Sequence, residues 1–143
     1  MKIAISACLM GDKVRYDGKH QLNKELSDIL KDHDVIKICP ELASGFSTPR
    51  KPMEIKDGKL INTDNKDLTK ELIQGCNRCL EMIKDCDLVI LKTKSPSCGY
   101  RQIYDGTFTN TLINKNGLFC QMCIDIGLRI YTEKNIDELR DIL

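Results

Sequence analysis

Four short apolar segments, separated by longer amphipathic ones, dominate the pattern along the chain. They are rich in Ile, Val and Leu, which is typical of strands buried on both faces of a parallel sheet. They cover residues 2–7, 34–38, 87–91 and 128–131. We therefore predict four strands, with helices between them.

Apolar residues between these segments recur at intervals of three and four, as on one face of a helix. A glycine after such a stripe favours a helix end, and an asparagine before one favours a helix start. The expected helices cover residues 22–30, 68–83, 118–126 before Gly127, and 136–143 after Asn135. This alternation predicts a single three-layer α/β domain over residues 1–143, with a mostly parallel, Rossmann-like sheet.

Two long segments do not fit this alternation. Residues 41–65 and 93–116 contain Pro and Gly and exceed the usual length of connections between strands and helices. Long ordered loops of this kind often carry function. Within the second segment, we expect a small hairpin over residues 103–108, because Asp105-Gly106 is a turn signal.

The composition excludes several classes of protein. The chain has 143 residues, 41% hydrophobic and 30% charged, with a net charge of +1. Its Lys and Arg are scattered, so we expect no extended nucleic-acid surface. No apolar run approaches the ~20 residues that span a bilayer, and the N-terminal apolar stretch is too short for a signal peptide. We therefore expect a cytoplasmic monomer or weak dimer without a membrane partner.

Three of the eight cysteines fall where predicted strands end. Cys8 ends the first strand, Cys39 ends the second, and Cys98 lies in the loop after the third. Because ligands of open parallel sheets bind beyond the carboxyl ends of the strands, these thiols are expected to meet at one rim. Cytoplasmic cysteines are more often reduced, metal-bound or catalytic than paired. Three thiolates suit a [4Fe–4S] cluster with one iron open to substrate, although small residues that end buried strands would also explain them.

The other cysteines support a rival interpretation. Cys76 and Cys79, like Cys120 and Cys123, have the spacing of half a zinc site. Their surroundings have helical periodicity, so these thiols equally fit an apolar core, as does Cys86. The alternative to an enzyme is thus a non-catalytic zinc or iron–sulfur module. An enzyme that thiolates nucleic acid is a third hypothesis, but it would need a tRNA surface or a partner.

Polar residues beside the three rim cysteines are candidates for acid–base chemistry. Glu41 follows Cys39 by two residues, so both would point the same way in an extended segment; otherwise Glu41 caps a helix or is solvated. Ser95 and Ser97 flank Pro96, where ordinary turn chemistry also explains them. Neither histidine lies near a candidate nucleophile, which argues against Ser–His–Asp hydrolysis.

Three blocks of residues, in order along the chain, resemble the thiouracil desulfurase family. The first block is Ser6-Ala7-Cys8-Leu9-Met10-Gly11 with Arg15-Tyr16-Asp17-Gly18. The second is Cys39-Pro40-Glu41 with Thr48-Pro49-Arg50, Pro52 and Glu54-Ile55. The third is Leu91-Lys92, Ser95-Pro96-Ser97-Cys98-Gly99 and Ile103-Tyr104-Asp105-Gly106-Thr107-Phe108. The chain departs from the family at Val14, where many relatives carry a cysteine, at Ser44-Gly45-Phe46, where Gly-Gly-Leu is usual, and at the helix start Gly117-Leu118-Phe119-Cys120.

The resemblance implies hydrolytic, non-redox removal of sulfur from 2-thiouracil or a similar small thiolated base, giving uracil and hydrosulfide. It implies a [4Fe–4S] cluster bound by Cys8, Cys39 and Cys98, and catalytic roles for Glu41 and a serine, for which Ser97 is favoured over Ser95. The expected substrate-binding residues are Arg15, Asp17, Arg50, Ser95 and Tyr104. The structural alternative is that the Arg and Asp residues among them form buried pairs that fix the loops.

Overall fold

A four-stranded parallel sheet forms the centre of the fold in the computed structural model, which describes residues 1–143. The strands are β1 (Lys2–Ser6), β2 (Asp34–Ile38), β5 (Leu88–Leu91) and β8 (Ile130–Thr132), in the order β2-β1-β5-β8. Every pairing between neighbours is parallel. The predicted parallel α/β sheet is confirmed, although its last strand begins at Ile130 rather than at residue 128.

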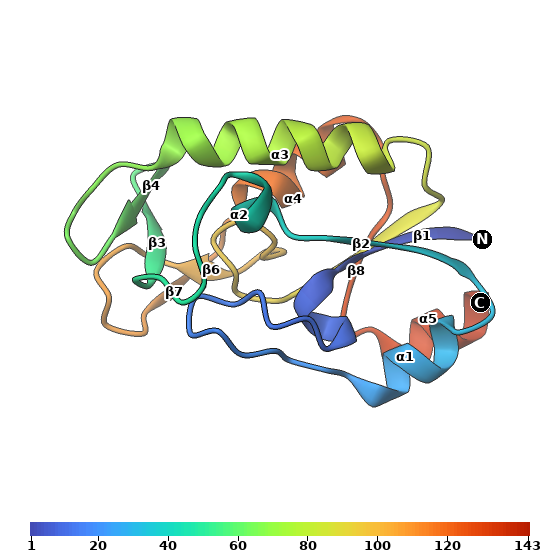
Figure 1. Ribbon diagram of the computed structural model, residues 1–143. Helices are drawn as coiled ribbons and strands as arrows, with labels where there is room; N and C mark the ends of the chain where they lie inside the picture. The colour runs from blue at the N-terminus through green and yellow to red at the C-terminus, as the bar shows by residue number, and fades with distance from the viewer.

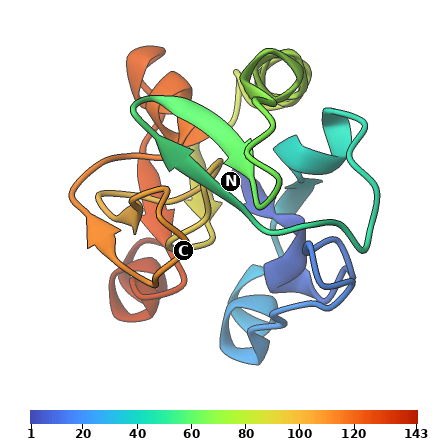
Figure 2. The ribbon, with the colours of Figure 1, turned by 90° about the vertical axis from the view of Figure 1, so that its left-hand side faces the viewer.

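Helices cover both faces of this sheet and give the fold three layers (Figures 1 and 2). One face packs against α3 (Thr69–Ile83) and α4 (Leu118–Asp125), and the other against α1 (Lys24–Leu30) and α5 (Ile136–Ile142). Because strand side chains alternate, Ala4 joins the first core while Ile3 and Ile5 join the second. Each face of the sheet therefore has its own apolar core.

Asparagine residues precede the starts of two helices, of which one differs from the prediction. The predicted apolar stripe begins at Leu22, but α1 begins at Lys24 because the side chain of Asn23 accepts a hydrogen bond from the Leu26 N–H (3.1 Å). Asn135 occupies the N-cap position of α5 as predicted. Its side chain, however, accepts from the N–H of Thr132 (2.8 Å) instead of capping the helix.

Both long segments form hairpins beyond the carboxyl ends of the sheet, at the left of Figure 1. The first hairpin, β3 (Met53–Lys56) with β4 (Lys59–Asn62), was not predicted. Its turn is Asp57-Gly58, where both residues have left-handed φ angles of 50° and 79°, as a two-residue turn requires.

The second hairpin pairs β6 (Ile103–Tyr104) with β7 (Leu112–Ile113). A hairpin was expected here, but the expected tight turn at Asp105-Gly106 is wrong, because residues 105–111 all lie in the connection. Gly106 instead lets the two hairpins approach each other closely. A Cβ atom there would overlap Lys56, and the φ of Gly106 is 93°.

A short helix after β2 packs against the long helix α3. The short helix α2 (Pro40–Ala43) follows β2, and the 3-10 helix η1 (Ala7–Met10) follows β1. Helix α2 packs against α3 where α3 has Gly75. A Cβ atom at Gly75 would overlap the Ser44 hydroxyl and the Pro40 carbonyl, so only glycine allows this contact.

We therefore expect Gly75→Ala to destabilise the protein, by about 1–3 kcal/mol of unfolding free energy, because it overpacks the α2–α3 contact. Urea denaturation measures this change. The control is Gln74→Ala at an exposed position one residue earlier, which should stay within about 0.5 kcal/mol of wild type. Gly→Ala in an unhindered helix stabilises by about 1 kcal/mol, so a more stable Gly75→Ala variant would contradict the contact.

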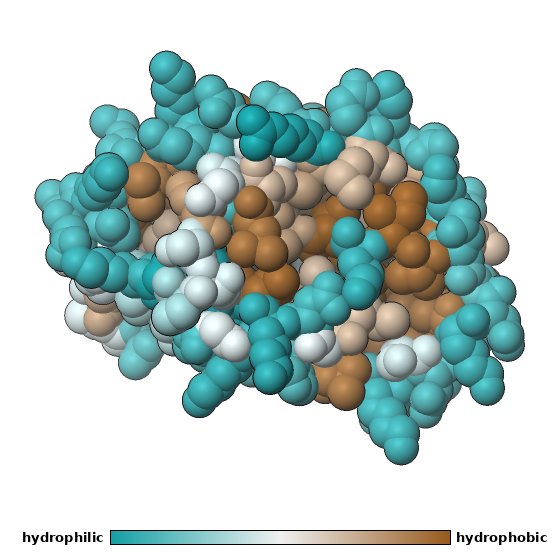
Figure 3. All heavy atoms as spheres, in the orientation of Figure 1, coloured by the Kyte–Doolittle hydropathy of each residue, from teal (hydrophilic) through white to brown (hydrophobic).

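The surface drawn in Figure 3 is hydrophilic along its edges, with hydrophobic residues gathered towards the centre of this face. Some large apolar residues, such as Leu42 and Met82, are exposed, as is common on the surfaces of folded proteins. None of the helices combines the length and the apolarity that a bilayer crossing requires.

Candidate active site

A cavity of about 560 Å³ lies beyond the carboxyl ends of the sheet strands, lined by residues of η1, of the loop that follows it, of α2 and of the two long segments. Of the ten site residues expected from the sequence, nine line this cavity. They are Cys8, Arg15, Cys39, Glu41, Arg50, Ser95, Ser97, Cys98 and Tyr104. The fold thus brings together residues that are up to 96 positions apart in the chain.

Three different local structures position the three rim cysteines. Cys8 lies in η1, directly after the buried strand β1. Cys39 is the N-cap residue of α2, with an extended backbone, and Pro40 follows at the first helical position. The backbone N–H of Cys98 donates to the Ser95 hydroxyl (3.0 Å) in the loop after β5. The exposed fractions of Cys8 and Cys98 are only 8% and 5%, and Cys39 is half-buried.

The electrostatics of these thiols matter for metal binding. Burial raises the pKa of Cys8 to about 11, and it also raises the pKa of Cys39 and of Cys98. Lys92 and Arg15 oppose this shift at Cys8, because their positive charges favour the thiolate. Without metal the thiols are therefore protonated at neutral pH, and metal binding would displace their protons.

The three rim thiols are a donor set suited to an iron–sulfur cluster. In this structure no three His, Cys, Asp or Glu side chains are arranged to hold one metal ion. The thiols of Cys8, Cys39 and Cys98 instead lie around a shared cavity, close enough to influence one another's pKa. A [4Fe–4S] cluster takes one thiolate on each iron, so three separated thiols could hold it and leave its fourth iron open.

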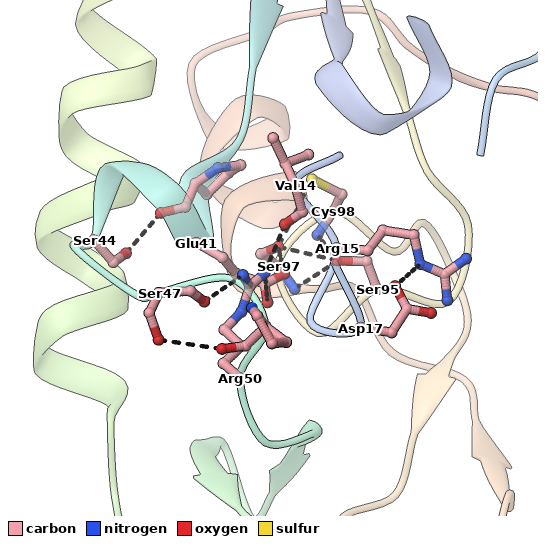
Figure 4. Close-up of polar contacts among 12 residues, drawn as sticks. Val14, Arg15, Asp17, Glu41, Ser44, Ser47, Arg50, Ser95, Ser97 and Cys98 are labelled. Carbon is pink, nitrogen blue, oxygen red and sulfur yellow. Dashed lines mark hydrogen bonds and ion pairs between the residues drawn. The ribbon is translucent and has the colours of Figure 1, made fainter. Parts of the chain in front are cut away.

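The side chain of Glu41 is held between an arginine and a serine (Figure 4). Its Oε1 atom pairs with Nη2 of Arg50 (3.1 Å), and its Oε2 atom accepts from the Ser97 hydroxyl (3.1 Å). The expected extended segment is wrong here, because Glu41 lies in the helix α2. Glu41 nevertheless lines the same cavity as Cys39, and its side chain is only 14% exposed.

Arg50 connects three segments around the cavity. Its guanidinium donates to the backbone carbonyls of Ser47 and Val14 (both 3.0 Å) as well as to Glu41, and its backbone N–H donates to the Tyr16 carbonyl (2.7 Å). The Nε atom of Arg50 is the only buried side-chain nitrogen or oxygen without a hydrogen-bond partner. Arg50 therefore fixes both the loops and the carboxylate of Glu41.

The two serines of the third block have different surroundings. The Ser95 hydroxyl accepts from the backbone N–H groups of Ser97 (3.2 Å) and Cys98 (3.0 Å), so it closes the turn. The Ser97 hydroxyl donates to Glu41 and lies 3.8 Å from the sulfur of Cys98. Ser97 is also the more buried, at 1% exposed. Of the two serines, Ser97 alone connects the carboxylate to a rim cysteine.

Asp17 is the one expected site residue that does not line the cavity. Its carboxylate lies 3.8 Å from Nε of Arg15 and accepts from the N–H of Lys19 (3.0 Å). Asp17 therefore fits the structural alternative, in which it pairs with Arg15 and fixes the loop. This pair is, however, partly exposed rather than buried.

Several residues that line the cavity were not expected. Lys92 directly follows β5, where the rule that located the cysteines could also have indicated it. The aromatic residues Tyr16 and Phe108 and a second acidic residue, Glu54, also line the cavity. Each of these three residues stands in one of the blocks that carry the family resemblance, so the resemblance could have indicated them.

The remaining cysteines belong to the core between α3, α4 and the sheet. Cys76, Cys79, Cys120 and Cys123 are each at most 2% exposed. Burial raises the pKa of Cys76 and Cys120 to about 12 and that of Cys79 to about 11. Packing among apolar side chains accounts for all four positions.

Comparisons with known proteins identify the family of the chain. The family model for 2-thiouracil desulfurase matches residues 3–135. An uncharacterized protein of Bacillus subtilis (strain 168), YbbK, is 35% identical over 99% of both chains. A solved structure of the [4Fe–4S]-dependent thiouracil desulfidase TudS matches with a TM-score of 0.90 and 30% identity, covering 99% of this chain and 96% of the other. On its sequence and its fold, the chain belongs to the 2-thiouracil desulfurase family.

Proposed function

We propose that this protein is a [4Fe–4S]-dependent, non-redox desulfurase of a small thiolated base such as 2-thiouracil. The base and water would give uracil and hydrosulfide, with no electron donor or acceptor. The observation that carries the proposal is one cavity lined by Cys8, Cys39 and Cys98 beside the hydrogen-bonded pair Glu41 and Ser97. Membership of the family and the similarity to TudS support it.

Cys8, Cys39 and Cys98 would hold the cluster as thiolates. When bound, such a cluster supplies an open iron, a Lewis acid that suits a soft thiocarbonyl sulfur and polarises the C–S bond. Lys92, Arg15 and Arg50 lie near enough to favour the thiolate forms of Cys8 and Cys39. These cations therefore assist the release of thiol protons when the site is assembled.

Glu41 would act as the proton acceptor of the site. It can take a proton from the water that attacks the thiocarbonyl carbon, and it can return a proton to the base as the C–S bond breaks. Arg50 holds one oxygen of its carboxylate, which limits its rotation. Ser97 donates to the other oxygen and could orient either the water or the base.

The wall of the cavity would bind the base. Tyr104 presents an aromatic ring to a planar heterocycle, while Arg15 and Arg50 contribute donors to its carbonyl oxygen. Ser95 would support this surface through the turn that it closes. Asp17 would act only through Arg15. Location in the cytoplasm and a monomeric or weakly dimeric state remain predictions.

Anaerobic purification, followed by iron and sulfide analysis and an assay of 2-thiouracil, tests the proposal. We expect brown protein with broad visible absorption, bound iron, and equal amounts of uracil and hydrosulfide formed without added reductant. Colourless protein with stoichiometric zinc and no hydrosulfide would favour the non-catalytic zinc module instead. A strict requirement for reductant would contradict the non-redox chemistry.

A further inference from the structure

The cavity contains two carboxylates, and the mechanism above uses only one of them. Glu41 engages both of its oxygens, with Arg50 and with Ser97. Glu54, on β3, lines the same cavity and is only 9% exposed. It makes no ion pair with any cation. A largely buried carboxylate without a cation partner is uncommon, so its role calls for an explanation.

One oxygen of Glu54 has a structural role. Its Oε1 atom accepts hydrogen bonds from the backbone N–H groups of Gly106 (3.0 Å) and Phe108 (3.1 Å). These contacts tie the β6–β7 connection to the first hairpin and fix the backbone of Phe108, whose φ is 57° and which lines the cavity. Glu54 thus positions part of the surface on which a flat base would lie.

The second oxygen of Glu54 has no hydrogen-bond partner among the protein atoms. This oxygen is not fully buried, because Arg50 Nε is the only fully buried side-chain nitrogen or oxygen that lacks a hydrogen-bond partner. The Oε2 atom therefore retains some solvent-accessible surface, on a residue that lines the cavity, and it remains free to accept a hydrogen bond.

A thiolated pyrimidine offers the matching donor. In 2-thiouracil, a ring N–H flanks the thiocarbonyl carbon on each side. When the sulfur faces the three cysteines, these N–H groups face the walls of the cavity. We propose that Oε2 of Glu54 accepts a hydrogen bond from a ring N–H of the base, so that Glu54 selects bases with a free N–H edge. This inference rests on the proposed function for its substrate class.

Glu54→Gln isolates this contact. The amide oxygen of glutamine can still accept from Gly106 and Phe108, but its NH₂ group then replaces the free acceptor. The iron-loaded protein is titrated anaerobically by calorimetry with uracil, 1-methyluracil and 3-methyluracil, which carry no sulfur to remove. We expect the substitution to weaken uracil binding roughly 10- to 150-fold, because the lost hydrogen bond is to a charged group. Methylation of one ring nitrogen should weaken wild-type binding by a similar factor and barely affect the variant.

Asp105→Ala is the matched control for a purely structural role. Asp105 accepts from the N–H (3.0 Å) and the hydroxyl (2.6 Å) of Thr107 in the same connection, but it does not line the cavity. Its loss should loosen the connection while keeping the selectivity against N-methylation.

Four results would overturn the role of Glu54. They are wild-type uracil affinity in Glu54→Gln, an undiminished penalty for methylation in that variant, loss of selectivity in Asp105→Ala, and no uracil binding by the wild-type protein. If the wild-type protein shows the expected binding pattern but releases no hydrosulfide from 2-thiouracil, the proposed function fails while the role of Glu54 is supported.

Discussion

Replacing any one of Cys8, Cys39 and Cys98 by Ala is expected to remove nearly all bound iron and, with it, all desulfurase activity. Each thiol reaches the cavity from the end of a different strand, and no other cysteine lines the cavity to take its place. A cluster with three protein ligands cannot spare one of them. Iron and sulfide content per protein chain, measured after anaerobic reconstitution, gives the result directly.

The core cysteines provide the control for this experiment. Cys79→Ala and Cys120→Ala should leave the iron content unchanged, because their side chains lie in the core between α3 and α4. They should lower only the unfolding free energy, by about 1 kcal/mol, through lost packing. If a Cys76 or Cys120 variant lost all iron while a Cys8 variant kept it, the assignment of the ligands would be wrong.

The second large effect is expected for Glu41→Gln. It should lower turnover per bound iron by about 10²- to 10⁴-fold, the usual contribution of a general acid or base. Glutamine can still contact Arg50 and Ser97 but cannot accept the proton. The cluster absorbance and the affinity for the base should therefore change little. Because turnover is divided by bound iron, incomplete loading does not imitate the effect.

A structural role for Glu41 would have a different outcome. Arg50 has a side chain only 8% exposed, so loss of its partner charge leaves a buried cation and lowers stability in either case. If Glu41 only braces Arg50, turnover of the folded, iron-loaded variant should equal that of wild type, and Glu41 would then leave the mechanism. Glu81→Gln, at an exposed position on α3, is the matched control; it loses only an exposed ion pair with Lys84 and should match wild type in iron content and turnover.

The cysteine rim could be predicted because it depends on short-range patterns. Cys8 and Cys39 directly follow apolar runs, and carboxyl ends of parallel strands share one edge. The same kind of signal was available elsewhere. Proline favours the first position of a helix, so Pro40 indicates that Glu41 is helical. Asp57-Gly58 is a turn signal between two short segments that each contain two apolar residues, and it indicates the hairpin that was missed.

By itself, the sequence determined the α/β class, the order along the chain of the four sheet strands and their main helices, and the cysteines at the strand ends, because periodicity and turn residues act over a few positions. Only the tertiary structure decided which polar groups meet. The Ser97 hydroxyl reaches Glu41 across 56 residues of chain, and the Gly106 N–H reaches Glu54 across 52. Asp17, by contrast, stays outside the cavity wall although its neighbours Arg15 and Tyr16 line it. Such contacts join segments whose relative positions depend on the packing of both cores, and no local pattern contains that information.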